Sequence, residues 1–400
     1  MKVLFITNWY PTRDFGYGGV FVREHAKAVR AAGNEVVVLH LARASKECRG
    51  LWKMEEELDP ELSEGIPAYH VYHRAMPLRG TSYPLYLRSA IKAFRRLRAG
   101  GFVPDVIHAH VYDAGVPAVM IGKRNGIPVV ITEQFTGFPR RTLNRAAVRK
   151  ARYAYRNADR ALPVSMHLQR SIEAYGIEAK FEIVPNVADT SMFFTATRKP
   201  EKADEKRMIF VGNLEPSQHK GYPTLLEALT LLGNRRSDWR LDVVGEGPER
   251  PEYQRRTEAA GLSGAVAFHG AKPKREIAEM MRGSDLFVLP SRFDNLPCVV
   301  VEALSSGLPV VSTTVGGIPE MVYDGAGILV PPDDPPALAD ALDSVLSNLD
   351  SYDRVNIAAE ARGRYSLEAV GAQLQTIYES VLSTSDKVAG GAATSKPAES

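Results

Sequence analysis

Residues 284–332 read SDLFVLPSRFDNLPCVVVEALSSGLPVVSTTVGGIPEMVYDGAGILVPP, and this stretch decides the fold. It contains three short apolar runs that predict strands: Leu286–Pro290, Pro309–Thr313 and Gly327–Pro331. An amphipathic helix is expected between the first two, roughly over Pro297–Ser306. A Gly-Gly turn and a short helix, Ile318–Tyr323, are expected between the last two. This alternation is typical of a parallel sheet wound with helices.

The turn after the first of these strands, SRFDNLP, carries carboxylates on both sides of an expected helix N-terminus. Ligands of parallel sheets bind beyond the carboxyl ends of strands, and free N–H groups at a helix N-terminus favour anions. Because a helix turns about 100° per residue, Asp294 lies at the mouth of the helix and Glu302 two turns further on a nearby face. We expect a phosphate at the amides and a hydroxyl-rich ligand between the carboxylates. The alternative is an ordinary helix with two surface carboxylates.

The same stretch resembles the donor site of retaining glycosyltransferases of family 4, which have the GT-B fold. The family signature is Glu, seven residues, Glu, then Ala-x-x-x-Gly-x-Pro-Val-Val. Its counterparts here are Asp294, Glu302, Ala303, Gly307, Pro309, Val310 and Val311, followed by the Gly-Gly-x-x-Glu pattern of Gly316, Gly317 and Glu320. Asp294 departs from the signature, since it keeps the charge of the first Glu but is one methylene shorter.

Length and composition limit the number of domains and the classes of protein to which the chain can belong. The chain has 400 residues, enough for two or three domains, with 44% hydrophobic and 24% charged residues as in soluble globular proteins. A net charge of +3 is too small to imply nucleic acid on its own. Cys48 and Cys298 share no motif, so we expect no disulfide or cysteine metal site and a cytoplasmic context. No run approaches ~20 apolar residues, and MKVLFITNWYP predicts a first strand rather than a signal peptide.

The first strand, Lys2–Thr7, is followed by a glycine-rich loop over Asn8–Val20. Its glycines are Gly16, Gly18 and Gly19, which do not form a dinucleotide fingerprint. The loop resembles the first glycine loop of the family, which faces the donor diphosphate across the cleft. Trp9 and Tyr10, at the carboxyl end of the strand, are candidate acceptor contacts, with buried packing as an equal alternative.

A later strand, Asp105–His110, places His108 and His110 on one face, because side chains two apart point the same way. No acid or cysteine completes a metal-ligand set at a suitable spacing, so core histidines are the usual interpretation. The resemblance implies a histidine at the end of this strand, near the transferred sugar, and His110 matches that place.

Two basic helices are predicted in the first half of the chain. The segment TSYPLYLRSAIKAFRRLRAG has a helical apolar stripe and a basic face, which can lie on an anionic membrane surface. A second face repeats arginines at steps of four or three: Arg141, Arg145, Arg149, Arg152, Arg156 and Arg160. Arg145, Arg149 and Arg152 are candidate contacts for phosphates of a lipid-linked acceptor or of membrane headgroups. A solvated face is an equal alternative; RNA fits less well, because few aromatics are interleaved, and no nucleic-acid partner is expected.

The second half opens with a charged linker, Arg198–Arg207, and the loop GNLEPSQHKGYPTLLEAL. Lys220 and the glycine after it match the lysine with which the family grips the diphosphate, but Asn213 stands where arginine is usual. Diphosphate binding would therefore rest more on Lys220 and helix amides, and His219 or Arg292 could compensate. Gly245 and Glu246 resemble the family's loop near the nucleoside.

From the resemblance we expect an α/β GT-B fold: two doubly wound Rossmann-like domains facing a central cleft. The acceptor-side domain would span 1–195, joined by a crossing helix over 366–383, and the donor domain 196–365. Phe181–Pro185 is predicted as a strand, 44–65 as irregular and 386–400 as a disordered tail.

The expected reaction moves a sugar from a UDP- or GDP-sugar to an acceptor hydroxyl with retention. The leaving phosphate would take the acceptor's proton on the same face. Glu302 would hold the ribose. Asp294, with the segment Asn295, Leu296, Pro297 and Cys298, would hold sugar hydroxyls and phosphate. Lys220 would offset the charge of the leaving diphosphate. No metal or other cofactor is expected.

The acceptor we expect is a lipid-linked glycan in assembly of a capsule, exopolysaccharide, O-antigen or teichuronic-type polymer. Peripheral contact with an anionic membrane, at the inner face of the cell membrane, remains open beside a purely cytoplasmic location. Asn213 and Asp294 also leave open a catalytically silent subunit that binds nucleotide-sugar within a glycan-assembly complex.

Overall fold

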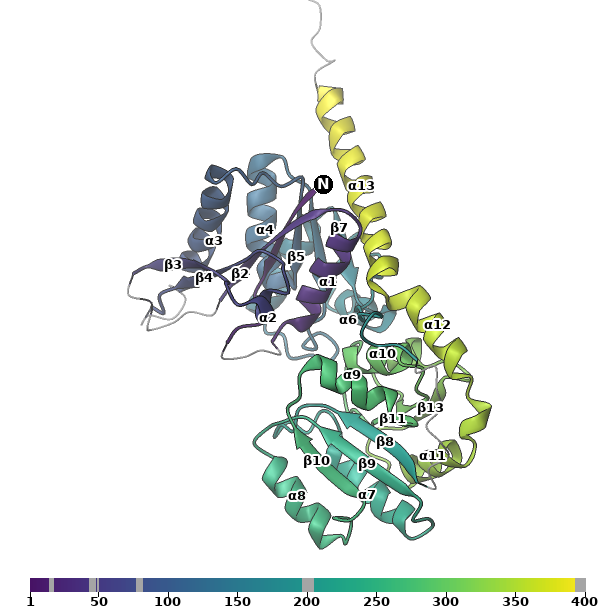
Figure 1. Ribbon diagram of the computed structural model, residues 1–400. Helices are drawn as coiled ribbons and strands as arrows, with labels where there is room; N and C mark the ends of the chain where they lie inside the picture. The colour runs from purple at the N-terminus through teal and green to yellow at the C-terminus, as the bar shows by residue number, and fades with distance from the viewer. Residues whose placement is uncertain (14–17, 43–47, 49, 77–81, 196–204, 393–400) are drawn as a thin grey trace, which may run out of the picture. The chain divides into compact units, whose positions relative to one another are not determined.

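The computed structural model describes residues 1–13, 18–42, 48, 50–76, 82–195 and 205–392, with side chains to residue 384 (Figure 1). The chain forms two compact units. The first contains residues 1–164, 168–185 and the last helix from Leu367, and the second contains 165–167 and 186–366. Each unit is built on its own largely parallel sheet.

The first unit contains a seven-stranded sheet. Its strands are β1 (Lys2–Thr7), β2 (Glu35–Leu41), β3 (Trp52–Glu56), β4 (Ala68–His73), β5 (Val106–His110), β6 (Val129–Glu133) and β7 (Arg160–Pro163). The order across the sheet is β3-β4-β2-β1-β5-β6-β7, and only β3 is antiparallel to its neighbour. The strands therefore run outward from β1 in both directions, which places a topological switch point between β1 and β5.

Helices cover both faces of this sheet. They are α1 (Val20–Ala31), α2 (Pro60–Ser63), α3 (Ser82–Ala99), α4 (Tyr112–Asn125), α5 (Arg145–Arg156), most of α6 (Met166–Glu173) and α13 (Leu367–Ala392). Right-handed crossovers put α1 on one face and α3, α4 and α5 on the other. α4 packs against both α3 and α5, whereas α13 packs along α1 (Figure 1). Gly371 allows α13 to approach α1 closely, because any Cβ at this position would lie only 2.4 Å from the Ala28 carbonyl oxygen.

The second unit contains a six-stranded parallel sheet. Its strands are β8 (Lys206–Val211), β9 (Trp239–Val244), β10 (Val266–Gly270), β11 (Leu286–Leu289), β12 (Val310–Thr313) and β13 (Gly327–Val330). The order β10-β9-β8-β11-β12-β13 places a switch point between β8 and β11. The helices are α7 (Tyr222–Gly233), α8 (Arg250–Ala259), α9 (Lys274–Arg282), α10 (Cys298–Ser305), α11 (Pro335–Ser347) and α12 (Arg354–Tyr365), with 3₁₀ turns at Ile318–Glu320 and Leu349–Ser351.

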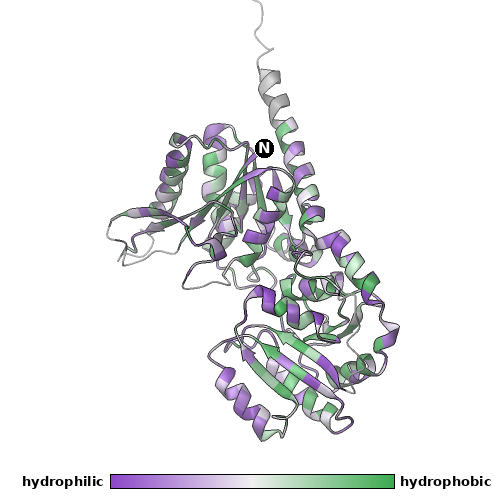
Figure 2. Ribbon diagram, in the orientation of Figure 1, coloured by the Kyte–Doolittle hydropathy of each residue, from purple (hydrophilic) through white to green (hydrophobic). Residues whose placement is uncertain are grey.

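Hydropathy follows this architecture within each unit. Figure 2 shows hydrophobic residues concentrated on the strands and a nearly continuous hydrophilic surface on α8. Val3, Leu4, Phe5 and Ile6 of β1 are completely buried, as are Leu286, Phe287, Val288 and Leu289 of β11. Strands buried on both faces explain why the sequence shows continuous apolar runs rather than alternation.

Several local predictions were wrong. Phe181–Pro185 is not a strand: Phe181 makes a single bridge to Ala161, and the neighbouring Pro163 has no N–H to extend a ladder. Residues 44–65 contain β3 and α2, which the sequence hides because β3 is a polar edge strand, WKMEE.

The predicted ends of elements also shift. α13 continues to Ala392, so the expected tail begins inside a helix, while 393–400 lie outside the described residues. β8 begins at Lys206, inside the expected linker, of which 196–204 are likewise outside. The arginine stripe is shorter than predicted, because Arg141 precedes α5 with φ of 54° and Arg160 lies in β7.

Candidate active site

An ion pair lies at the switch point of the second sheet. Lys220 is in the loop after β8 and Asp294 in the loop after β11, and their Nζ and Oδ2 atoms are 2.6 Å apart. The side chains are only 17% and 14% exposed, and the Ser291 hydroxyl donates to the same carboxylate oxygen at 3.2 Å. Largely buried charges of this kind are stable only when paired. The pair is thus a cation and an anion held ready at the edge where a sheet of this type binds ligands.

Glycines let the loops approach closely enough to form this pair. Gly221 has φ of 72°, and a Cβ there would lie 1.8 Å from the Pro290 carbonyl oxygen. Gly316 has φ of 58°, and its Cβ would lie 1.6 Å from the carbonyl oxygen of Asp294. Neither the backbone conformation nor the space admits another residue without a shift. The Gly-Gly pattern therefore fixes the backbone that carries Asp294.

The N-terminus of α10 adjoins the pair and offers backbone donors. Pro297 is the N-cap and makes no side-chain cap, and the first turn contains no acidic residue. Within the described residues, the amides of Cys298 and Val299 make no hydrogen bond. Free amides and the positive end of the helix dipole favour an anion here, as the sequence predicts.

Further charges belong to the same cluster. Glu302 on α10 is 6% exposed, and its Oε1 lies 3.4 Å from Nζ of Lys274. Burial, followed by the nearby Glu302 carboxylate, raises the pKa of the Cys298 thiol to about 12. Asp294 also raises this pKa, whereas Lys274 and Lys220 lower it, so all four charges lie within electrostatic reach of one sulfur.

The loops after β8 and β9 meet beside this cluster. Gly245 has φ of 146°, and a Cβ there would lie 2.0 Å from the Gly212 carbonyl oxygen. Asn213 is exposed, and Glu246 is exposed and paired with Arg250 at 2.7 Å. Glu246 is therefore held at the rim of the loop.

His219 and Arg292, which could compensate for the arginine missing at Asn213, both have partners away from the Lys220–Asp294 pair. Arg292 forms an ion pair with Asp333 at 2.9 Å, and the His219 ring stacks on Phe293 with centroids 5.6 Å apart. Lys220 and Lys274 are thus the cations that the structure brings to the cluster.

The sequence did not reveal the role of one supporting residue, Asn186, or the partners of another, Glu320. Asn186 donates through Nδ2 to the Leu296 carbonyl oxygen at 2.6 Å, which anchors the loop carrying Asp294. Glu320 accepts from the backbone N–H groups of Met166 and His167, each at 2.8 Å. The Gly-Gly-x-x-Glu spacing singled out Glu320 but not its partners. Nothing near Asn186 indicates a partner 110 positions away.

His108 and His110 lie on β5, at the switch point between β1 and β5. The rings of His108 and His110 stack with centroids 4.6 Å apart, which confirms their common face. His110 is completely buried, and neither of its ring nitrogens has a hydrogen-bond partner in the described residues. Burial lowers its pKa well below the usual value, so the ring is neutral at physiological pH. His108 bonds the Tyr378 hydroxyl at 2.6 Å and Thr132 Oγ1 at 2.7 Å.

The backbone after His110 is strained. Val111 has φ of 65°, a conformation that β-branched residues rarely adopt, and its N–H donates to the Thr132 carbonyl oxygen at 2.8 Å. Such strain persists only where surrounding contacts impose it, and it concentrates at functional sites.

Glu133, at the carboxyl end of β6, is a buried acid that the sequence reasoning did not assign. It accepts hydrogen bonds from the amides of Tyr112, Gln134 and Phe135 and from the Tyr155 hydroxyl, the last at 2.5 Å. Burial raises its pKa, and these hydrogen bonds oppose the rise. An acid ending an otherwise apolar strand was the available signal. Its role is to shape the loop beside His110 and Val111.

The candidate acceptor contacts differ in exposure. Tyr10 is 2% exposed, with its ring 6.5 Å from that of His40, so packing explains it rather than contact with an acceptor. Trp9 is half-buried beside Phe21 and Phe135. Gly19, with φ of 73°, follows Gly18 and would place a Cβ 2.3 Å from the Trp9 carbonyl carbon. Gly16 lies outside the described residues.

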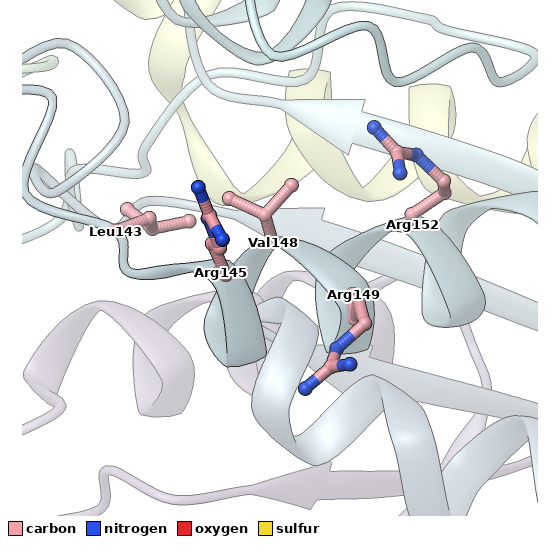
Figure 3. Close-up of a pocket in the computed structure, with 5 residues that line it drawn as sticks. All are labelled: Leu143, Arg145, Val148, Arg149 and Arg152. Atoms are coloured by element: carbon pink, nitrogen blue, oxygen red, sulfur yellow. The ribbon is translucent and has the colours of Figure 1, made fainter.

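Arg145, Arg149 and Arg152 of α5 border a hollow of about 600 Å³ that is also lined by Leu143 and Val148 (Figure 3). Arg145 and Arg149 are exposed, and no carboxylate among the described residues pairs with them. Arg152 is half-buried and donates to the Tyr175 carbonyl oxygen at 3.1 Å. Figure 3 shows Arg149 pointing away from Arg145 and Arg152, so the three do not converge on one point.

The described residues contain neither a membrane-spanning helix nor a cluster of metal ligands. None of their helices combines the length and the apolar character needed to cross a bilayer. They also contain no group of three or more His, Cys, Asp or Glu side chains arranged to hold a metal ion.

Comparison with known families agrees with this architecture. Residues 18–192 match the model described as Glycosyltransferase Family 4, and residues 192–362 match Glycosyl transferases group 1. The chain belongs to the family 4, group 1 glycosyltransferases and is a transferase enzyme with the GT-B fold.

Individual relatives span most of the chain. The putative teichuronic acid biosynthesis glycosyltransferase TuaC of Bacillus subtilis is 26% identical over 360 residues, covering 86% of this chain and 88% of the relative. Sucrose-phosphate synthase of Thermosynechococcus elongatus superimposes with a TM-score of 0.74 at 20% identity, over 96% of this chain and 99% of that one. Anabaena Alr3699/HepE, in complex with UDP and glucose, has a TM-score of 0.73 at 20% identity, over 95% and 100%.

Proposed function

We propose that this enzyme transfers a sugar, with retention, from a nucleoside-diphosphate sugar to a hydroxyl of a lipid-linked glycan during cell-surface polysaccharide assembly. The observation that carries the proposal is the Lys220–Asp294 pair beside the open amides of α10. A diphosphate needs cations and N–H donors, and a sugar needs a hydroxyl acceptor such as a carboxylate. The site combines these groups at a sheet switch point.

Each group has a role in the proposed reaction. Phosphate oxygens accept from the amides of Cys298 and Val299, and Lys220 turns from Asp294 toward the diphosphate. Asp294, released from the lysine, accepts from sugar hydroxyls, and Glu302 accepts from the ribose. As the diphosphate leaves, its charge grows, and the preorganised Lys220 ammonium stabilises that charge most in the transition state.

Cationic and amide groups supply this stabilisation without a metal in the proposed mechanism. We assign His110 to the transferred sugar on the family resemblance alone. Its neutral ring suits a hydrogen bond rather than a charge contact.

The donor class and the polymer are supported by relatives. Anabaena Alr3699/HepE is described in complex with UDP and glucose, which favours a uridine donor over a guanosine one. The Bacillus relative is named for teichuronic acid biosynthesis, a cell-surface polymer of the class proposed here. We place the reaction at the cytoplasmic face of the membrane, where a lipid-linked acceptor would be presented.

A thermal-shift panel of UDP-, GDP- and ADP-sugars without metal tests the donor site. A ligand at about 100 times its dissociation constant adds ~2.7 kcal/mol to the free energy of unfolding. We expect one nucleotide class to respond and the response to be lost in Glu302→Ala. No response to any donor, with or without Mg²⁺, would contradict the proposal.

Turnover of the responding donor then tests the reaction. Release of the nucleoside diphosphate should require an acceptor or water and should fall in Glu302→Ala. The matched control is Glu276→Ala, which removes an exposed carboxylate of the same unit whose only ion-pair partner among the described residues is Lys272. Equal turnover of both variants would refute the role of Glu302.

A further inference from the structure

One face of the first unit carries a strong and nearly uncompensated positive charge. α3, α4 and α5 lie together on this face of the sheet. α3 contributes five Lys or Arg residues, α4 two and α5 five, whereas Asp113 is the only acid in the three helices. The helices therefore carry a formal charge of +11, twelve cations less one anion. The whole chain is only +3, which leaves −8 for the rest of it.

Ten of these twelve cations are exposed, whereas Lys150 and Arg152 are half-buried. Within the described residues, Lys150 with Asp113, at 2.8 Å, is the only ion pair that the twelve form. On α5, Arg145, Arg149, Tyr153 and Arg156 are exposed, while Ala151, Ala154 and Tyr155 are buried. On α3, Arg88, Lys92, Arg95, Arg96 and Arg98 are all exposed. Like charges so arranged repel one another unless an anionic partner lies against them.

The position of Arg145 adds a further unfavourable electrostatic interaction to this repulsion. It is the first residue of α5, where the positive end of the helix dipole disfavours a cation. Neither packing nor an ion pair offsets this placement, because the side chain is exposed and unpaired within the described residues. An external anion at this end of the helix would remove the penalty.

We propose that the outer face of α3, α4 and α5 docks onto an anionic lipid bilayer. The arginines of α5 diverge, which fits many headgroups spread over a plane better than one phosphate (Figure 3). Leu143 and Val148 line the hollow between them and give a phospholipid headgroup an apolar floor for its first methylenes. Tyr153, 42% exposed within the stripe, is a side chain suited to the membrane interface.

This proposal rests on the proposed function, in which the acceptor is lipid-linked, and it says which face of the first unit would meet the membrane that holds the acceptor. α4 begins two residues after His110, and α5 follows the loop that begins at Glu133. Both helices therefore start at the carboxyl edge of the sheet, where the first unit presents its candidate site. A membrane on this face would meet that edge at the Arg145 end of α5.

Vesicle binding tests the proposal with the full chain. Vesicles of phosphatidylcholine with phosphatidylglycerol are compared with phosphatidylcholine alone, at low and high salt. The test variant is Arg145→Gln/Arg149→Gln/Arg156→Gln. The control variant, Arg255→Gln/Arg275→Gln/Arg362→Gln, removes three exposed arginines of the second unit and leaves the same net charge.

We expect the unmodified chain to bind only the anionic vesicles and to lose binding at high salt, where screening is strong. Each basic residue near such a surface contributes about 1 kcal/mol, so the α5 variant should bind about a hundredfold more weakly and the control about as well as the unmodified chain. Equal binding of the two variants, or no binding of anionic vesicles at low salt, would overturn the proposal. Tighter binding of a single-stranded RNA than of vesicles at the same salt would also overturn it.

Donor binding without vesicles separates this proposal from the reaction. All three proteins should show the same thermal shift with the responding nucleotide sugar, which also shows that they are folded. If no donor bound while the vesicle result held, the proposed reaction would fail and the docking surface would stand.

Discussion

Replacing Gly316 by alanine should disable the donor site through the backbone alone. The new methyl carbon would lie 1.6 Å from the Asp294 carbonyl oxygen, and real contacts of this kind are not closer than 3.0 Å. The loop carrying Asp294 must therefore move by at least 1.4 Å, the difference between these distances. A displacement of ~1 Å at a reacting centre costs on the order of 10²-fold in rate. The shift would also separate Asp294 from Lys220.

Gly325→Ala provides a matched control in the same unit. Gly325 also has a positive φ, of 89°, but a Cβ there meets no atom within 4 Å. Both variants pay the conformational penalty of roughly 1–2 kcal/mol for an alanine in the left-handed region. Gly316→Ala adds a steric cost of about 1–3 kcal/mol.

The two variants are compared by urea unfolding, by donor affinity from thermal shifts and by release of nucleoside diphosphate. We expect Gly325→Ala to lose modest stability and keep its turnover, and Gly316→Ala to lose about 100-fold or more in turnover. If Gly316→Ala kept turnover within a few-fold of Gly325→Ala, the glycine would not be fixing the site and the reasoning would be refuted.

Three further predictions concern single residues. Lys220→Met should lower turnover by about 10²–10³-fold, because a charge aimed at the leaving diphosphate is removed. Lys272→Met, which removes a half-buried lysine paired with Glu276, should not lower turnover, and equal single-turnover rates of the two variants would contradict the role of Lys220. Tyr378→Phe should lower the free energy of unfolding by about 1–3 kcal/mol, since it leaves Nδ1 of buried His108 without a partner; urea unfolding measures the loss, and donor affinity should not change. Burial lowers the pKa of His25 to about 4. Between pH 6.5 and 4 this histidine is therefore protonated in the unfolded chain but neutral in the folded one. The free energy of unfolding should fall as pH falls through this range, by up to ~1.4 kcal/mol per pH unit. His25→Gln should reduce this slope between pH 7 and 5, and an unchanged slope would assign it to other groups.

The sequence predicted the elements of the second unit closely where patterns were local. The strands expected at 286–290, 309–313 and 327–331 are β11, β12 and β13, each ending or starting within one residue of the prediction. The helix expected over 297–306 is α10, at Cys298–Ser305. Apolar runs bounded by Gly and Pro leave little freedom, so these elements follow from short-range chemistry.

Contacts between distant segments were not predictable in the same way. The Lys220–Asp294 pair joins residues 74 apart, and it exists because the strand order makes β8 and β11 neighbours. Asn186 and Leu296 are 110 apart, and neither has a local pattern that indicates the other. β3 escaped prediction because an edge strand is stabilised by its single neighbour and needs no apolar pattern.

The placement of α13 in the first unit affects how the chain can fold during synthesis. Gln375 bonds Asn34 and Tyr378 bonds His108, across 341 and 270 positions of sequence. When residue 185 has been made, the helix that covers α1 is still 181 residues from its start, the span from 186 to 366. At about 5–20 residues per second, the ribosome needs roughly 10–40 s to reach it. During that interval the apolar surface of α1 that α13 later buries stays uncovered, while the later unit is being completed. The first unit to be synthesised is thus the last to be finished, and a chaperone that shields α1 would act in that interval.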